Sequence, residues 1–225
     1  MRGYIRRLVI GILLIAGCFF LGMACVEHKP FAEAKEKQEA LVDVAAGGDS
    51  PADDPLMREI DFHTLREINP DIIGWLYVPQ IGVDLPVLQG RDNYSYLNLD
   101  FEKNSSPLGS VFTWPHADGK LSDLHICLFG HNMPSGQMFG KLHEFKDRDF
   151  MQKNGKFYLY TPERSKELEV VSVFECDRTD GVFQDGWTSG VAGQTVTLAT
   201  CTGYGATPDR LVVNGCVARE RLVLK

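Results

Sequence analysis

The fold of this chain is decided by three consecutive stretches, which read TVTLATC at residues 195–201, TGYGATP at 202–208 and RLVVNGCV at 210–217. The first and third are apolar and rich in β-branched residues, which is typical of strands, whereas the glycines and the proline between them interrupt a strand. If the two strands pair as antiparallel neighbours, the loop returns the chain to the end where the first strand stops. Cys201 and Arg210 are then expected at the same end of a sheet.

Six similar segments precede this pair. They are short, β-branched or aromatic, and separated by Gly, Pro, Asn and Asp: Gly74–Val78, Val83–Leu88, Gly109–Thr113, His125–Phe129, Lys156–Tyr160 and Glu169–Phe174. Helical patterns are few, with a short amphipathic stretch that contains Leu65 and stops before Asn69-Pro70, and a second one over Gln137–Phe145. The sequence therefore predicts a mainly β protein, a closed or nearly closed barrel of about eight strands with a few short peripheral helices.

The N-terminus carries an apolar run, LVIGILLIAGCFFLGMACV from Leu8 to Val26, which has 19 residues and no charge. A helix of that length spans a hydrocarbon core of roughly 30 Å. Three arginines precede it, and positive flanks tend to stay in the cytoplasm. We expect residues 1–26 to be a single-pass membrane anchor and the rest of the chain to lie outside the cell.

Two other interpretations of this segment stay open, a cleaved signal peptide and a lipoprotein signal processed at Cys18. The chain body lies outside the cytoplasm in each case. Residues 27–55 are rich in Ala, Glu, Lys and Asp and show no sustained apolar face, so we expect an extracytoplasmic stalk or linker that is helical at first and flexible at its Gly-Pro stretch. The folded domain is expected over residues 56–225.

Composition excludes some classes of function. The chain has 44% hydrophobic and 24% charged residues, as globular proteins do, and a net charge of −7 without a basic patch. Phosphate backbones repel such a protein, so we expect no nucleic-acid partner. We also expect no metal and no cofactor, because Cys127 and His131 read as parts of a strand region and no second ligand pair completes a tetrahedral site.

The cysteines beyond the apolar run are Cys127, Cys176, Cys201 and Cys216. They could form two disulfides in an oxidising compartment, and counting alone does not decide this. Cys127 and Cys216 lie inside strand-like runs, where a cysteine usually behaves as a small buried hydrophobe. Cys201 ends its strand and opens onto a loop, which suits a nucleophile, although an inert strand-end thiol is the alternative.

A reactive thiol needs a proton-transfer partner and a group that stabilises charge. His131 also ends a strand, after Gly130, which permits close backbone approach, and before Asn132, which could orient its ring. Arg210 could donate to an oxyanion, with an exposed surface arginine as the alternative. The other histidines read as surface or packing residues: His28, His63, His116, His125 and His143.

These residues resemble the signature of the sortase family. Gly130-His131-Asn132, the strand Thr197-Leu198-Ala199-Thr200-Cys201 and the later Arg210 match its His, TLxTC and Arg elements in order. Further stretches resemble class B in particular: residues 69–76 (NPDIIGWL), 84–90 (DLPVLQG), 92–97 (DNYSYL), 109–112 (GSVF) and 129–133 (FGHNM). The resemblance covers about residues 56–217.

The resemblance implies an eight-stranded barrel that acts in surface-protein anchoring in Gram-positive bacteria. Such enzymes cleave a C-terminal sorting signal of a secreted protein after its threonine, hold the acyl group as a thioester and pass it to a cell-wall peptide amine. Cys201 would be the nucleophile, His131 the general acid and base, and Arg210 the stabiliser. Asn132, Leu198 and Thr200 would bind substrate.

Two alternatives remain beside this expectation, an extracytoplasmic cysteine peptidase that hydrolyses its substrate and a tethered binding module without catalysis. The chain also departs from class B in one segment. Only about twenty residues separate Phe174 from Thr195, where class B members often carry a longer insert with a helix that takes part in substrate recognition. The resemblance therefore does not identify the sorting motif.

Overall fold

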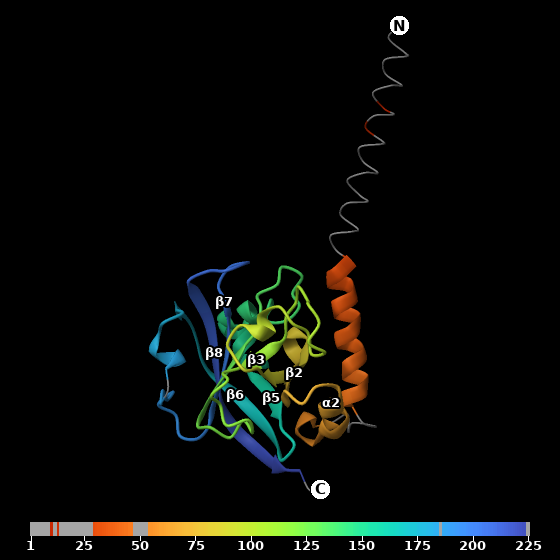
Figure 1. The fold of residues 1–225 in the computed structure, drawn as a ribbon. Coiled ribbons are helices and arrows are strands. Elements are labelled where there is room, and N and C mark those ends of the chain that lie inside the picture. The colour runs from red at the N-terminus through yellow and green to blue at the C-terminus, as the bar shows by residue number, and fades with distance from the viewer. Residues whose placement is uncertain (1–9, 11–12, 14–28, 47–53, 185, 224–225) are drawn as a thin grey trace.

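The protein is built around the strands β1 (Ile72–Val78), β2 (Val83–Gln89), β3 (Val111–Thr113), β4 (His125–Phe129), β5 (Lys156–Tyr160), β6 (Arg164–Asp177), β7 (Thr195–Cys201) and β8 (Asp209–Leu222). They close into a barrel in the order β1-β2-β3-β4-β7-β8-β6-β5 (Figure 1). The β2–β3 and β4–β7 pairs are parallel. The computed structural model describes residues 10, 13, 29–46, 54–184 and 186–223. The prediction of a closed eight-stranded barrel is confirmed.

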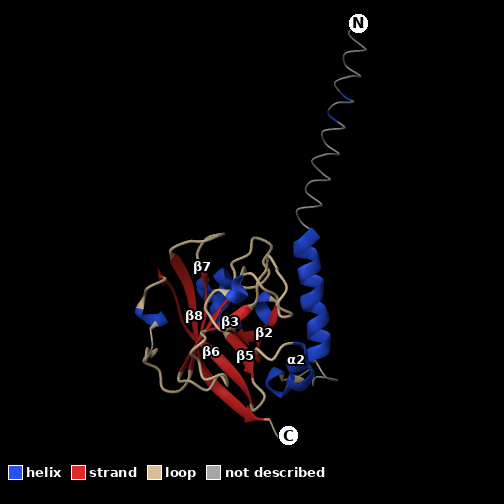
Figure 2. Cartoon of the chain, in the orientation of Figure 1, coloured by secondary structure: helices blue, strands red, loops and turns tan. Residues whose placement is uncertain are grey.

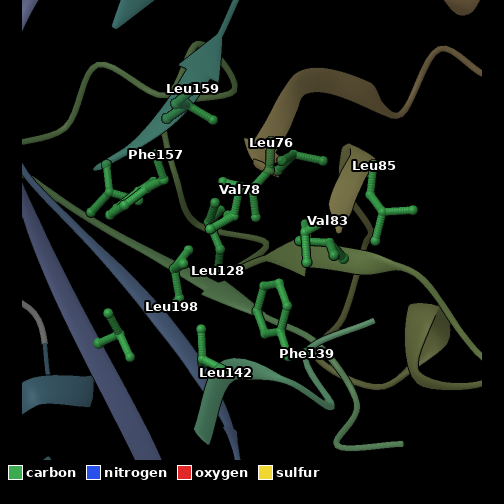
Figure 3. Packing of buried hydrophobic residues seen from close by; sticks show 14 of the residues in the cluster. Leu76, Val78, Val83, Leu85, Leu128, Phe139, Leu142, Phe157, Leu159 and Leu198 are labelled. Carbon is green, nitrogen blue, oxygen red and sulfur yellow. The ribbon is translucent and has the colours of Figure 1, made fainter. Parts of the chain in front are cut away.

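The core follows from the alternation of side chains along each strand. In β4, Ile126 and Leu128 point into the barrel, and Leu198 of the adjacent β7 meets them there. Figure 3 shows Leu128, Leu198 and Leu142 around the ring of Phe139, all of them fully buried. The barrel interior is therefore filled by aliphatic side chains and closed by residues from the segment after β4.

Helices are peripheral, and apart from one long helix beside the barrel they are short (Figure 2). Besides a helix over residues 29–45, they are α2 (Phe62–Ile68), α3 (Arg148–Asn154) and the 3-10 turns η1 (Pro55–Met57), η2 (Pro79–Ile81), η3 (Ser95–Leu97), η4 (Leu142–Lys146) and η5 (Gly181–Phe183). Asp61 caps α2 by accepting a hydrogen bond from the Thr64 amide at 3.0 Å. This helix ends before Asn69, as predicted. Among the described residues, no helix combines the length and the apolar character that a membrane crossing needs.

The first part of the expected stalk is a helix over residues 29–45, and this helix packs on the barrel. It lies along the barrel in Figure 1, with Leu41 3% exposed and Ala45 fully buried. Its contact face contains Phe31, Ala34 and Gln38 besides these two residues, so a polar side chain interrupts the apolar face in the sequence. Most of the predicted anchor, residues 1–26, and the end of the predicted stalk, residues 47–53, lie outside the described residues.

The predicted helix over Gln137–Phe145 is also replaced by another structure. Met138 has a positive φ of 52° and forms a bridge with Asn132, so the chain turns back instead of starting a helix. A helical turn begins only at Leu142. α3 then starts behind Asp147, whose carboxylate accepts a hydrogen bond from the Phe150 amide at 2.8 Å.

A chain of hydrogen bonds crosses the outer face of the barrel from β4 to β6. His125 Nε2 and Thr197 Oγ1 lie 2.8 Å apart, Thr197 donates to Asn214 Oδ1 at 2.6 Å, and Asn214 Nδ2 donates to Ser172 Oγ at 3.0 Å. Trp187 packs on the His125 ring with centroids 4.7 Å apart. Burial lowers the pKa of His125 to about 4.

Gly215 of β8 lies where the barrel interior is tightly packed. A Cβ there would lie 2.3 Å from the Phe157 ring and 3.3 Å from Leu168. We expect Gly215→Ala to lower the free energy of unfolding by about 1–3 kcal/mol, because the ring cannot move without strain. Chemical denaturation measures the change. Gly181→Ala is the matched control, since its Cβ would meet nothing within 4 Å, and an equal loss in both variants would contradict the packing argument.

His125 predicts a pH dependence of stability. Its folded pKa of about 4 is below the unfolded value of about 6.5, so only the unfolded state takes up this proton between these pH values. The free energy of unfolding should fall as pH decreases through that window. Denaturation at pH 7 and pH 4.5 should show a smaller loss for His125→Gln than for the wild type. The exposed His63 supplies the control His63→Gln, which should keep the wild-type slope; equal slopes in all three proteins would refute the role of His125.

Candidate active site

The parallel pairing of β4 with β7 brings the predicted histidine next to the predicted nucleophile. Phe129, the last residue of β4, lies opposite Ala199 of β7. The Gly130 amide extends this ladder by donating to the Ala199 carbonyl at 3.2 Å. His131 and Cys201 each follow two residues after that register pair, so they take corresponding positions at the end of the two strands.

Arg210 joins them from the neighbouring strand. The register of β7 and β8 pairs Cys201 directly with Arg210, and side chains opposite each other in an antiparallel pair share one face, with Cβ atoms about 4.5–5.5 Å apart. Leu198 and Leu211 point into the core, so alternation places Cys201 and Arg210 on the outer face. The three predicted catalytic residues therefore lie in one row across the ends of β4, β7 and β8.

A backbone carbonyl holds the ring of His131. Its Nε2 lies 2.7 Å from the Leu97 carbonyl oxygen, at the end of η3. Because a carbonyl only accepts, this nitrogen carries the proton, and Nδ1 is the ring atom left for proton exchange. Gly109 packs against this carbonyl, since a Cβ on it would lie 2.5 Å from the Leu97 oxygen, and its φ of 58° suits glycine.

Asn132 ties the histidine segment to the nucleophile's backbone. Its Nδ2 donates to the carbonyls of Cys201 at 3.0 Å and Gly203 at 3.3 Å, and lies 3.1 Å from His143 Nε2. The residue is 7% exposed. Asn132 is thus a buried clamp between the loops after β4 and β7. Substrate binding by this residue stays a prediction, and its contacts favour a positioning role.

The other two residues predicted to bind substrate are also buried. Leu198 is fully buried in the barrel core, and Thr200 is 2% exposed. The Thr200 hydroxyl donates to the Gly130 carbonyl at 2.8 Å and so joins β7 to the residue before His131. Substrate binding by Leu198 and Thr200 stays a prediction. In the structure, both side chains are buried beneath the end of β7, where they pack or bond to the backbone of the site.

The guanidinium of Arg210 is fixed by its own loop. One of its nitrogens, Nη1, donates to the carbonyls of Thr207 at 2.5 Å and Asp209 at 3.1 Å. This leaves the rest of the planar fork, Nε and Nη2, to donate elsewhere. On the other side of Arg210, β6 pairs it with Cys176. Arg210 thus has a cysteine opposite it on each neighbouring strand.

The four cysteines within the described residues are free, and their surroundings separate them. Cys127 is fully buried and Cys216 is 6% exposed, as their strand-like context predicts. Burial, reinforced by Asp180 and Asp177, raises the pKa of Cys176 to about 11, so this thiol stays protonated at neutral pH. Cys201 is half-buried and has the histidine and the arginine beside it, which makes it the best placed nucleophile.

Aromatic side chains cover the outer face next to this row. Phe129, two residues before His131, contacts Phe183 of η5 with centroids 6.1 Å apart and Trp114 at 5.6 Å. Trp114 in turn meets His125 edge-on at 6.0 Å. The short segment between β6 and β7 therefore lies over the outer face of β4 and β7 and borders the site with rings.

Sequence reasoning missed two contributors to the site. The Leu97 carbonyl belongs to the backbone, so no side-chain pattern reveals it. His143 is expected to be a surface or packing residue, and its ring does pack; the contact with Asn132 is what the sequence did not indicate. The turn at Met138 brings it there, and that turn is what the predicted helix over Gln137–Phe145 lacked. Within the described residues, no three side chains of His, Cys, Asp or Glu lie together so as to hold a metal ion.

The chain has clear relatives. The model of the sortase domain matches residues 76–218. Sortase B of Listeria monocytogenes is 30% identical over 115 residues, which are 51% of this chain and 47% of that protein. Sortase B of Staphylococcus aureus is 30% identical over 123 residues, 55% of this chain and 50% of that protein. The chain thus spans about half the length of the curated relatives that it matches.

Solved structures of class B sortases share its fold. The structure of sortase B from Bacillus anthracis in complex with AAEK1 superposes with a TM-score of 0.68 at 23% identity, covering 84% of this chain and 98% of that one. Sortase B of Clostridium perfringens gives a TM-score of 0.62 at 28% identity, with 70% and 99% covered. The S. aureus sortase B–substrate complex gives 0.64 at 25% identity, with 70% and 84% covered. Since the sortase domain matches more than half of the chain, this protein belongs to the sortase family and is similar to class B.

Proposed function

We propose that this chain is a sortase-type cysteine transpeptidase with Cys201, His131 and Arg210 as its catalytic residues. The observation that carries the proposal is the row formed at the ends of β4, β7 and β8, where the registers Phe129↔Ala199 and Cys201↔Arg210 align a thiol, an imidazole and a guanidinium on one face. Membership of the sortase family supports the same assignment.

The first half of the reaction forms a thioester. Nδ1 of His131 takes the proton of the Cys201 thiol, and the sulfur attacks the carbonyl carbon of the scissile peptide bond. The negative charge that develops on the oxygen is stabilised by donors of the Arg210 fork. The C–N bond then breaks. The leaving amine takes a proton from His131, whose Nδ1 is the atom left for exchange by the Leu97 contact.

The second half transfers the acyl group. An incoming amine attacks the thioester carbon, and His131 accepts the proton that the amine loses. The new C–N bond forms, the C–S bond breaks and the Cys201 sulfur leaves as thiolate. Arg210 stabilises the second oxyanion as it did the first. A thioester keeps the acyl group reactive toward an amine, which is what transfer requires.

The substrate class is proposed from the family. The donor is a secreted protein with a C-terminal sorting signal, cleaved after its threonine, and the acceptor is a cell-wall peptide amine. A structural relative, sortase B of S. aureus, has been seen in complex with a substrate. The enzyme is proposed to work at the outer surface of the cell membrane of a Gram-positive bacterium, held there as a single-pass protein by residues 1–26, most of which lie outside the described part of the chain.

The test is capture of the covalent intermediate. We expect intact-mass spectrometry of the wild type with a panel of threonine-containing signal peptides to show an acyl-enzyme that an added amine converts to an amide product. Cys201→Ala should stay folded and show no adduct, because the nucleophile is gone, whereas the Cys176→Ala control should still react. An adduct on Cys201→Ala would refute the assignment, and hydrolysis that added amine leaves unchanged would favour a peptidase.

The Leu97 carbonyl generates a separate prediction. Gly109→Ala places a Cβ 2.5 Å from this oxygen and should displace the acceptor of His131, lowering kcat about 10- to 100-fold. Steady-state kinetics of amide formation measure the change. Gly82→Ala is the matched control, because Gly82 also has a positive φ, 71°, but no atom within 4 Å of the added Cβ. If both variants lose the same activity, backbone strain and not the carbonyl is responsible.

A further inference from the structure

The helix over residues 29–45 contacts the loops that hold His131. Lys37 Nζ lies 2.8 Å from Glu102 Oε2 and 3.3 Å from Asp100 Oδ2, both in the segment after η3. One residue further, Gln38 Nε2 donates to the Met138 sulfur at 3.3 Å, in the segment after β4. Two neighbouring side chains on one helix therefore reach two loops that are far apart in sequence.

The first of these loops presents the acceptor of His131. Asp100 organises it, because its Oδ1 accepts from the amides of Glu102 at 3.0 Å and Asn104 at 2.8 Å. Leu99 pairs with Ser105 across the turn. The Leu97 carbonyl, which lies at the entrance of this turn, accepts from His131. A shift of the Asp100 turn is thus a shift of the atom that orients the imidazole.

The second loop carries His131 itself. Met138 bridges to Asn132, the residue after the histidine, and the Phe139 amide donates to the His131 carbonyl at 2.9 Å. Phe139 also supports the residue before it, since a Cβ on Gly130 would lie 2.9 Å from the Phe139 ring. The contact of Gln38 with Met138 therefore acts on the backbone on both sides of the catalytic histidine.

The helix over residues 29–45 is fixed to the barrel by packing and by a hydrogen bond. Leu41 and Ala45 are buried, Phe31 and Ala34 pack against the core cluster that contains Met138 and Phe139, and the Asp61 amide donates to the Ala45 carbonyl at 3.0 Å. Lys37 keeps its charge, because hydrogen bonding to Glu102 raises its pKa. The Lys37 side chain is 45% exposed, and ion pairs this exposed add little to overall stability.

We propose that Lys37 and Gln38 are positioning residues for His131, and that the helix over residues 29–45 braces the active site from outside the barrel. The inference rests on the proposed function for its kinetic readout. Lys37 holds the loop after η3, whose Leu97 carbonyl accepts from His131. Gln38 holds the loop after β4, which carries His131 itself. Removing both contacts frees the imidazole to leave its orientation while the barrel stays folded.

The experiment compares full-length Lys37→Met, Gln38→Leu and the double variant with Lys37→Arg and Lys35→Met. Lys35 is the matched control, because its ion-pair partner is Glu39 on the same helix. We expect kcat for amide formation to fall about tenfold in the double variant, with KM within about twofold, a displaced pH profile of kcat and an unchanged Tm. Lys37→Arg should retain activity, and Lys35→Met should match the wild type.

A second readout separates this inference from the proposed function. The rate at which iodoacetamide alkylates Cys201, followed peptide by peptide across pH, needs no substrate and reports on the imidazole beside the thiol. We expect its pH profile to shift in the double variant but not in Lys35→Met, even if the wild type forms no acyl-enzyme. Unchanged kcat and unchanged alkylation in the double variant would overturn the inference. The inference would also be overturned if the double variant lost activity together with a lower Tm and if Lys37→Arg lost activity to the same extent.

Discussion

The parallel pairing of β4 with β7 is the constraint on which the site depends. Two segments remote in sequence meet there, and the Thr200 hydroxyl joins them at the carbonyl of Gly130. Gly130 has no side chain, so the Phe139 ring packs directly against its backbone. The sheet register thus fixes His131 against Cys201 before any contact between their side chains is considered, and the β7–β8 register adds Arg210.

Neutral groups, backbone carbonyls and one side-chain amide, hold the proposed catalytic residues. The imidazole is oriented by the Leu97 carbonyl, the strand end that carries the thiol by the amide of Asn132, and the guanidinium by the carbonyls of Thr207 and Asp209. A carbonyl restricts the direction of a donor without placing a full negative charge beside it. None of these contacts therefore pairs the Arg210 guanidinium with a carboxylate, which suits the proposed role of Arg210 at a developing oxyanion.

The strands could be predicted because their signal is local. Runs such as HICLF and TVTLATC are β-branched or apolar throughout, and the structure places β4 at His125–Phe129 and ends β7 at Cys201. Non-local structure was missed. The predicted stalk packs on the barrel through one helix face that contains Phe31, Ala34, Leu41 and Ala45, and the polar Gln38 interrupts this face in the sequence. The turn at Met138 depends on its bridge to Asn132, a contact that no window of the sequence contains.

The position of Arg210 between two cross-strand cysteines has a consequence for disulfide formation. Cys201 and Cys176 are both cross-strand partners of Arg210, so two strand spacings, about 9.4–9.8 Å, separate their backbones. A disulfide needs Cα atoms closer than about 7 Å. Because β8 lies between β6 and β7, Cys176 is too far from Cys201 to form an internal disulfide with it.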